Sequence, residues 1–216
     1  MYFDELDLND NVLDALYDMR FDTCTPVQEK CIPEILEGHD VLGVAQTGTG
    51  KTAAYLLPVL SKLDDGGYPK DAINCVIMSP TRELAQQIYD NFVLYGKKLP
   101  VYPTVIFGGV NQQGQVNALH RGADVVIACP GRLWDLMNQG FVHLDKVETF
   151  VLDEADRMLD MGFVHDVKKV IAKLPKVRQN LMFSATMPAE IEQLAAGILR
   201  DPAFVKVDPV SSTVDR

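Results

Sequence analysis

A glycine-rich segment at residues 45–52 carries the strongest chemical signal in this sequence. It reads Ala-Gln-Thr-Gly-Thr-Gly-Lys-Thr and lies between an apolar, β-rich run and a helical pattern. Gly48 and Gly50 allow positive φ angles and a close approach of the backbone, so successive N–H groups can point at one anion. The following helix adds the positive end of its dipole. The segment therefore predicts a phosphate cradle.

The end of this segment indicates a nucleoside triphosphate and a divalent cation. In such loops the lysine, here Lys51, reaches the β- and γ-phosphates, and the hydroxyl of the next residue, Thr52, is a ligand for Mg²⁺. The first position of the pattern is Ala45 where glycine is usual. We treat this as tolerable, because the cradle itself spans residues 47–52. A glycine-rich surface loop is the alternative.

A second signal is the acidic run Asp-Glu-Ala-Asp at residues 153–156, which directly follows an apolar run. Ligands of open α/β sheets bind at the carboxyl ends of the strands, so these carboxylates should face the same crevice as the phosphate loop. Asp153 would hold Mg²⁺, directly or through water, and Glu154 would orient or deprotonate the attacking water. The alternative is an acidic first turn of a helix.

The elements that must position these residues alternate between strands and helices. Continuous β-branched runs are typical of strands buried on both faces of a parallel sheet. Their alternation with helical patterns predicts an α/β fold with helices on both faces. The predicted strands are residues 41–44, 75–78, 101–107, 125–128, 149–152, 181–183 and 204–207. The predicted helices are residues 11–19, 26–36, 51–63, 82–99, 111–121, 133–139, 164–173 and 188–199.

Composition and charge limit the class of protein. The 216 residues are 47% hydrophobic and 23% charged, which excludes a disordered or low-complexity chain. The longest apolar run, residues 53–60, is much shorter than the about 20 residues of a membrane-spanning helix, so we expect no membrane segment. The net charge of −10 argues only weakly against nucleic acid, because exposed charges are screened beyond about 8 Å.

The four cysteines and four histidines do not form a recognisable zinc motif. The cysteines include no CxxC pair, and the histidines are scattered singly along the chain. We therefore expect reduced, mostly buried thiols and a cytoplasmic protein. The first residues have neither a basic nor an apolar stretch, so no secretory signal is expected.

These motifs and several others together resemble one known family. In chain order they are residues 21–28, 45–52, 80–85, 108–109, 130–132, 153–156 and 184–186. The chain resembles the N-terminal RecA-like half of a DEAD-box RNA helicase over roughly residues 3–207. The resemblance implies a RecA-like P-loop NTPase fold, a three-layer sandwich with a mostly parallel central sheet. It also implies ATP and Mg²⁺ as cofactors and RNA as a partner.

The resemblance assigns roles to individual residues. Lys51, Asp153 and Glu154 would be catalytic, and the Gln28 amide would read the N6 and N7 edge of adenine. The residues implied for ATP are Phe21, Gln28, Gln46, Thr47, Gly48, Thr49, Gly50, Lys51 and Thr52. Those implied for coupling ATP hydrolysis to strand separation are Asp156, Ser184 and Thr186. Those implied for the RNA backbone are Pro80, Thr81, Arg82, Gly108, Gly109, Pro130, Gly131 and Arg132.

Each of these roles has a structural alternative. Gln28 could be an ordinary polar helix residue, and the arginines could form surface ion pairs. Phe21 or Phe3 could stack on the base or simply pack in the core. Ser184 and Thr186 could hydrogen-bond the acidic run or cap the helix that follows.

Three positions depart from the family pattern. Arg20 stands where glycine is usual before the aromatic residue, and Cys24 stands where proline is usual. Both could alter the stiffness of this loop. Cys129 replaces the usual threonine before Pro-Gly-Arg, and because a thiol is a poor hydrogen-bond donor, a hydroxyl contact to RNA is in doubt there.

The resemblance also implies a domain organisation. Residues 1–208 would be one ATP-binding helicase domain, with the glutamine motif within residues 1–36, and residues 209–216 would be a linker or an end. The His-Arg-x-Gly-Arg motif of a second RecA-like half does not occur in these 216 residues. That half supplies an arginine finger, which is worth about 10³–10⁵ in rate for phosphoryl transfer.

We therefore expect this chain alone to bind ATP with Mg²⁺ weakly and to hydrolyse it slowly or undetectably. Joined to the second half, it would unwind RNA with little sequence preference, as a monomer. Two other hypotheses use the same cleft. One is an ATP-dependent RNA clamp that rarely turns over, which Glu154 argues against. The other is a different P-loop motor, such as a DNA translocase, which would not need Gln28.

Overall fold

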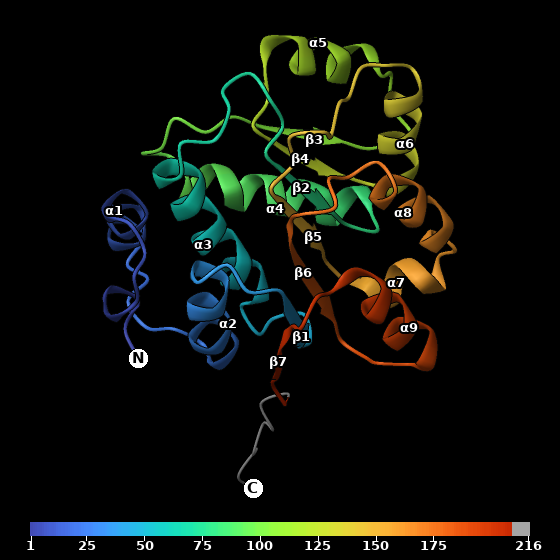
Figure 1. Cartoon of the computed structure of the whole chain (residues 1–216). Helices are drawn as coiled ribbons and strands as arrows, with labels where there is room; N and C mark the ends of the chain where they lie inside the picture. The colour runs from blue at the N-terminus through green and yellow to red at the C-terminus, as the bar shows by residue number, and fades with distance from the viewer. Residues whose placement is uncertain (209–216) are drawn as a thin grey trace, which may run out of the picture.

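A seven-stranded sheet forms the centre of the molecule in the computed structural model (Figure 1), which describes residues 1–208. The strand order is β3-β4-β2-β5-β6-β1-β7, and every pairing in the sheet is parallel, as predicted. The strands are β1 Val41–Val44, β2 Cys75–Met78, β3 Pro103–Ile106, β4 Val125–Ala128, β5 Thr149–Leu152, β6 Gln179–Ser184 and β7 Ala203–Lys206. The predicted linker or end at residues 209–216 lies outside the described residues.

Helices cover both faces of the sheet (Figure 1), which confirms the three-layer α/β architecture. They are α1 Asp10–Asp18, α2 Pro26–Leu36, α3 Lys51–Asp65, α4 Arg82–Tyr95, α5 Gln113–Arg121, α6 Pro130–Asn138, α7 Ala155–Asp160, α8 Val164–Ile171 and α9 Ala189–Ile198. A short 3₁₀ helix, η1, spans Phe3–Glu5. Within residues 1–208, no helix is both long enough and apolar enough to cross a membrane.

Two hydrophobic cores lie on opposite sides of the sheet, because successive side chains of a strand point to opposite faces. In β2, Cys75 and Ile77 belong to the core under α1 to α4, whereas Val76 and Met78 belong to the core under α5 to α9. A strand whose side chains are buried in a core on each side of the sheet has no polar face. This is the reason for the continuous apolar runs in the sequence.

Some element boundaries differ from the predicted ones. The helix expected over residues 82–99 ends at Tyr95, where Gly96, a poor helix former, follows and its carbonyl accepts the Leu99 amide at 3.0 Å. The helix expected over residues 133–139 begins at Pro130. Proline is favoured in the first helical turn because its missing N–H is not needed there.

Candidate functional site

The phosphate loop lies at the carboxyl end of β1 and leads into α3, which begins at Lys51. Gly48 has φ 91° and Gly50 has φ 86°, both in the region that favours glycine. A Cβ atom on Gly50 would lie 2.5 Å from the Gln28 Nε2 atom and 2.8 Å from the Thr25 Oγ1 atom. Glycine is therefore required at this position by both its conformation and its close neighbours.

Backbone donors of this loop remain available for a ligand. Among residues 1–208, the N–H groups of residues 47, 48 and 50–53 donate to no acceptor. Three of them belong to the first turn of α3, where N–H groups have no partner within the helix and the helix dipole is positive. This combination of free donors and a helix N-terminus fits a phosphate group.

The acidic run meets the phosphate loop in one pocket. The Lys51 Nζ atom lies 2.9 Å from the Asp153 Oδ1 atom and 3.2 Å from the Glu154 Oε1 atom, and all three side chains are buried. The strands before them, β1 and β5, both flank β6, so their carboxyl ends reach the same edge of the sheet. The pocket has a volume of about 340 Å³.

The charge state of Lys51 follows from this arrangement. Burial alone lowers the pKa of the Lys51 ammonium, but the carboxylates of Asp153 and Glu154 outweigh it and raise the pKa above its ordinary value. Lys51 is therefore a cation held between two anions. A phosphate group bound at this loop would meet a positive charge that is already in place.

Glu154 has the most constrained position in the pocket. Its φ of 54° is left-handed, which is costly for a residue other than glycine and is common at functional sites. The Glu154 Oε1 atom also accepts a hydrogen bond from the Thr47 hydroxyl at 3.1 Å. Glu154 thus joins the phosphate loop to the end of β5.

Tyr55 lies behind the pocket, where it contacts Asp153, and the sequence did not identify it as part of this site. Its hydroxyl donates to the Asp153 Oδ2 atom at 2.8 Å, and its ring is fully buried. Burial, and then the charge of Asp153, raises the pKa of the Tyr55 phenol well above its ordinary value, so the hydroxyl stays a donor. The spacing of Lys51 and Tyr55, one helical turn on the same face, is the signal that could have identified it.

The residues proposed for Mg²⁺ fit a hard cation. The Asp153 Oδ1 and Glu154 Oε2 atoms are buried and accept no hydrogen bond within residues 1–208, although Lys51 Nζ lies 2.9 Å from the first and Arg157 Nη1 lies 3.5 Å from the second. Thr52 lines the same pocket. Carboxylate and hydroxyl oxygens are suitable ligands for Mg²⁺, so the donor set agrees with the predicted cation.

The predicted adenine-reading residues are arranged differently from expectation. The Gln28 Oε1 atom accepts from the Thr25 amide at 2.9 Å, and the Nε2 atom donates to the Gly50 carbonyl at 3.1 Å. Gln28 therefore closes a capping box on α2 and holds the phosphate loop. The Gln28 Oε1 atom can accept one more hydrogen bond, and the Nε2 group can donate one more. The Thr-x-x-Gln spacing from Thr25 was a readable signal for this second role.

The two phenylalanines proposed to stack on the base differ in solvent exposure. Phe21 is 47% exposed and borders the pocket with Gln28. Phe3 is buried in the core under α1 to α4, so the idea that Phe3 stacks on a base is wrong. Of the two, only Phe21 is placed to contact a ligand.

Of the residues predicted for coupling, Ser184 and Thr186 both hydrogen-bond Asp156, the third, and not Asp153. The Asp156 Oδ2 atom accepts from the Thr186 hydroxyl at 2.8 Å and from the Thr186 amide at 3.0 Å. The Ser184 hydroxyl accepts from the Asp156 amide at 3.3 Å and donates to the Thr186 carbonyl. These bonds link the start of α7 to the end of β6.

The residues predicted to contact RNA gather at the ends of three neighbouring strands. Thr81 follows β2, Gly109 follows β3 and Pro130 follows β4, and these strands are adjacent in the sheet. The Arg82 guanidinium lies 4.9 Å from the centre of the Phe107 ring. The Arg132 Nη2 atom donates to the Val110 carbonyl at 2.9 Å. Both arginines are thus oriented by neighbours within the chain.

Comparison with known proteins gives consistent matches. A model of the DEAD/DEAH box helicase family matches residues 25–194. The chain is 42% identical over 215 residues to the ATP-dependent RNA helicase CshA of Limosilactobacillus reuteri, and 43% identical over 209 residues to the ATP-dependent RNA helicase DeaD of Haemophilus influenzae. The crystal structure of a DEAD box protein from Methanococcus jannaschii superposes with a TM-score of 0.90 at 38% identity, over 96% of this chain.

These relatives are longer than the chain. The match covers 43% of the L. reuteri protein, 33% of the H. influenzae protein and 56% of the M. jannaschii chain. The chain therefore spans about half or less of the proteins that it resembles.

Proposed function

This chain belongs to the DEAD/DEAH box helicase family, and from that premise we propose that it is the N-terminal, ATP-binding half of an ATP-dependent RNA helicase. Residues 1–208 act as one domain in this proposal, with the glutamine motif within residues 1–36. A second RecA-like domain completes the enzyme. We include a monomeric state in the proposal. We also include a cytoplasmic location, because an RNA substrate and four free cysteines suit a reducing compartment.

One observation carries the proposal more than any other. Lys51 at the end of the phosphate loop lies within 3.2 Å of both Asp153 and Glu154 at the end of β5. A purely structural ion pair would not need free backbone donors beside it. A triphosphate site needs both the charged side chains and the free backbone N–H groups. The observed pairing therefore supports a site where phosphate, a cation and an attacking water meet.

Several residues bind ATP in this proposal. The backbone of Gln46 to Gly50 surrounds the phosphates, and Lys51 contacts the β- and γ-phosphates. Phe21 and the spare hydrogen-bonding positions of Gln28 bind the adenine. Thr52 and Asp153 would hold Mg²⁺, which supplies charge neutralisation at the phosphates when bound.

Glu154 takes the role of positioning the attacking water. Its Oε2 atom is buried and accepts no hydrogen bond within residues 1–208, although Arg157 Nη1 lies 3.5 Å from it, so this oxygen can accept a further hydrogen bond. Binding of a phosphate would draw Lys51 and Thr47 away from the Oε1 atom. The carboxylate could then orient water or accept its proton, while Arg157 stays beside the Oε2 atom.

RNA binds at the ends of β2, β3 and β4 in this proposal. Arg82 and Arg132 contact phosphates, helped by backbone N–H groups at Gly109 and Gly131. Contacts of this kind read the sugar-phosphate backbone and give little sequence preference. Asp156, Ser184 and Thr186 take the coupling role in this proposal, because their hydrogen bonds tie α7, which follows the acidic run, to the end of β6.

Competition binding tests the nucleotide part of the proposal. A fluorescent ATP analogue should bind this chain in the presence of Mg²⁺, unlabelled ATP should displace it, and GTP should displace it at least tenfold less well. Lys51→Ala should abolish binding, while the exposed control Lys176→Ala should leave it unchanged. Equal displacement by GTP and ATP would remove Gln28 from the adenine site.

Phosphate release tests the enzyme as a whole. The chain alone should turn over slowly or not at all. Fusion to the second RecA-like domain of a relative should give ATP hydrolysis that RNA stimulates and DNA does not. An RNA clamp predicts RNA binding without stimulated turnover, and Glu154→Gln should convert the fused enzyme into that state.

A further inference from the structure

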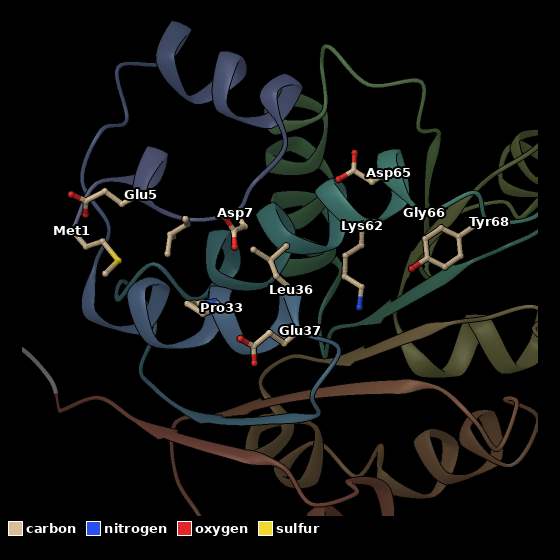
Figure 2. A pocket seen from close by; sticks show the side chains of 11 residues that line it. Met1, Glu5, Asp7, Pro33, Leu36, Glu37, Lys62, Asp65, Gly66 and Tyr68 are labelled. Atoms are coloured by element: carbon tan, nitrogen blue, oxygen red, sulfur yellow. The ribbon is translucent and has the colours of Figure 1, made fainter.

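A cavity of about 580 Å³ lies between the N-terminal segment and the ends of two helices (Figure 2). Its volume is in the range of ligand-binding cavities and exceeds that of the pocket at the phosphate loop. Three segments form its walls, as Figure 2 shows. They are Met1 with residues 5–7, the end of α2 with Pro33, Leu36 and Glu37, and the end of α3 with Lys62, Asp65, Gly66 and Tyr68.

This cavity is far from the site described above. Both α2 and α3 begin beside the phosphate loop, where Gln28 contacts Gly50, and both run away from it. Because a helix rises about 1.5 Å per residue, the 15 residues of α3 place its end about 22 Å from the loop. A partner in the cavity would leave the nucleotide pocket and the RNA-contact strands uncovered.

The rim of the cavity is acidic, and three of its four carboxylates have no basic partner within residues 1–208. Glu5, Asp7, Glu37 and Asp65 all line it. Among the ion pairs of residues 1–208, none includes Glu5, Asp7 or Asp65. The C-termini of α2 and α3 add negative partial charge at the same place. The opposing charges that line the cavity are Lys62 and the Met1 amino group.

Lys62 does not neutralise this rim. Its Nζ atom donates to the Gln179 Oε1 atom at 2.6 Å and lies 3.5 Å from the Ile35 carbonyl, so its charge is directed toward the sheet. Within the part of the chain that the structure describes, Asp65 and Glu5 accept hydrogen bonds only from neutral groups, the Asn9 amide and the Tyr2 backbone.

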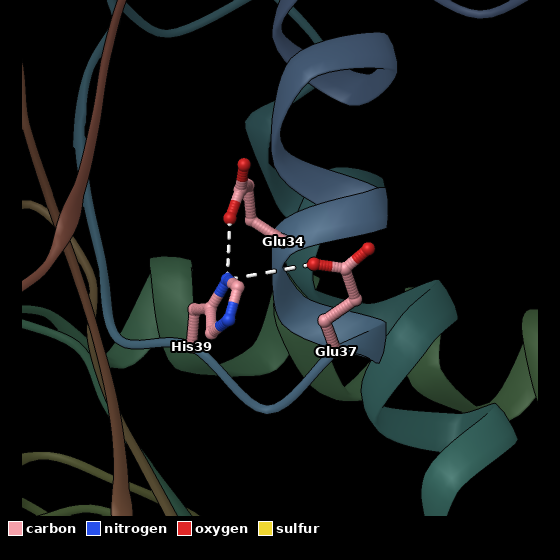
Figure 3. Close-up of side chains that lie close together, drawn as sticks. All are labelled: Glu34, Glu37 and His39. Atoms are coloured by element: carbon pink, nitrogen blue, oxygen red, sulfur yellow. Dashed lines mark hydrogen bonds and ion pairs between the residues drawn. The ribbon is translucent and has the colours of Figure 1, made fainter.

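Within residues 1–208, Glu37 has one basic partner, His39, which lies outside the cavity. The His39 Nδ1 atom lies 2.6 Å from the Glu34 Oε2 atom and 3.7 Å from the Glu37 Oε2 atom (Figure 3). The hydrogen bond to Glu34 raises the pKa of the exposed His39 imidazole. Because Glu34 takes the closer contact with His39, Glu37 keeps capacity for another cation.

The floor of the cavity is apolar. Leu6 is buried, and Pro33 and Leu36 are half-buried side chains that face the same space. An apolar floor under an acidic rim selects a ligand with an apolar part and a positive charge at a short distance from it. Lysine and arginine side chains next to an aliphatic residue have this character, because their methylene stems are apolar and their ends are charged.

We propose that this cavity is the docking site for a basic peptide segment of a partner protein, in which lysine or arginine residues alternate with an aliphatic residue. The aliphatic side chain lies on Leu6, Pro33 and Leu36. The cationic side chains pair with Asp7, Glu37 and Asp65. The inference does not depend on the proposed function, because it uses none of the residues of the nucleotide site.

The net charge of −10 makes a charge-matched control essential, since any basic peptide is attracted to an acidic protein. The probe is a fluorescein-labelled amide of Arg-Leu-Lys-Leu-Arg, and binding is followed by fluorescence anisotropy at physiological salt. The test variant is Asp7→Asn/Glu37→Gln/Asp65→Asn. The control is Asp145→Asn/Asp160→Asn/Glu192→Gln, which removes the same charge from exposed residues elsewhere.

We expect the test variant to bind the probe at least tenfold more weakly and the control to bind within twofold of the unmodified chain. Equal weakening of both variants would overturn the proposal in favour of non-specific attraction. A probe with serine in place of leucine should bind at least fivefold more weakly. If it binds equally well, or if spermidine displaces the peptide at stoichiometric concentration, the site recognises charge alone and the peptide proposal is wrong.

A second measurement does not depend on the stability of the variants. In backbone amide NMR spectra of the unmodified chain, the probe should shift the resonances of residues 36, 37, 65 and 66 and leave residues 47–52 unchanged. Shifts confined to other residues would contradict the proposed location. Unchanged ATP-analogue affinity in the test variant would confirm that it is folded, and it separates this inference from the proposed function.

Discussion

Lys51 is buried beside two carboxylates, so its charge has a structural role in addition to its proposed role toward phosphate. Removing one member of a buried ion pair leaves the other charges without a partner and typically costs about 3–5 kcal/mol. We therefore expect Lys51→Met to lower the free energy of unfolding by about 3 kcal/mol at pH 7. Chemical denaturation followed by circular dichroism measures this.

A combined variant separates charge from packing. Adding Asp153→Asn and Glu154→Gln to Lys51→Met removes the two carboxylate charges that the lysine leaves unpaired, so the deficit should shrink. The exposed Lys176→Met variant should show no deficit. A deficit of equal size with and without the two amide substitutions would mean that the loss comes from packing.

Arg20 has a backbone conformation that suits glycine. Its φ is 59°, and the left-handed region costs an ordinary L-residue about 1–2 kcal/mol. Because the side chain is exposed and forms no ion pair within residues 1–208, Arg20→Gly should raise the free energy of unfolding by about 1 kcal/mol. Arg20→Ala is the matched control and should give no gain. A loss of stability in Arg20→Gly would show that the arginine side chain contributes more than its backbone costs.

The sequence allowed the main contacts of the pocket to be anticipated, but not every partner. Lys51 and Asp153 could be placed together because both follow strands of a parallel sheet, whose carboxyl ends share one edge. The bond from Tyr55 to Asp153 depends on the exact rotation of α3 against β5, which spacing alone does not determine. The double engagement of Gln28 depends on how closely the phosphate loop approaches α2.

The start of α6 lacks a side-chain cap. Cys129 is the N-cap residue, and its thiol accepts no hydrogen bond from the first turn. A threonine hydroxyl in this position accepts such a bond, which is worth about 0.5–2 kcal/mol. Cys129→Thr should therefore raise the thermal midpoint by a few degrees. Cys129→Ala should not, because it supplies no acceptor, and an equal rise in both variants would point to hydrophobic packing instead.

Element boundaries were less predictable than the elements themselves. Seven strands and eight helices could be anticipated to within a few residues because long apolar runs and 3.6-residue patterns average over many side chains. Helix α7 was not predicted. It has only six residues and follows the left-handed Glu154, so the sequence contains neither a periodic pattern nor a usual N-cap residue that would indicate it. The backbone conformation of Glu154 is set by its contacts in the pocket, which are tertiary.

The interior of the whole molecule should make its stability sensitive to alkaline pH. Burial raises the pKa of the Cys31 and Cys75 thiols to about 12, and the pKa of Cys129 to about 11. In the unfolded chain these thiols lose their protons near their ordinary value of 9.0. Their contribution is thus fully present below pH 9 and is lost as the pH rises toward 12. Buried tyrosines such as Tyr55 act in the same direction.

We expect the free energy of unfolding to fall by a few kcal/mol between pH 8 and pH 10. Denaturation in the presence of a reductant measures it. Cys31→Ala and Cys75→Ala should each make the decline shallower, whatever their effect at pH 8. A decline of unchanged slope in both variants would assign the pH dependence to other groups.

The distribution of charge over the whole molecule determines how RNA would bind to this chain. The net charge of −10 opposes a polyanion at long range, whereas Arg82 and Arg132 are fixed beside the ends of β2 and β4. Each phosphate contact to a single strand changes the slope of log K against log salt by about −0.7. Two arginine contacts therefore predict weak binding with a slope of about −1.4.

Titration of a labelled single-stranded RNA at several salt concentrations measures this slope. Arg82→Ala should reduce its magnitude by about 0.7, while Lys176→Ala, which lies before β6 at the opposite edge of the sheet, should leave it unchanged. A slope steeper than about −3 would require more cations than these two strand ends supply. The RNA would then have to contact basic residues on another part of the surface, away from the sheet edge that also holds the proposed ATP pocket.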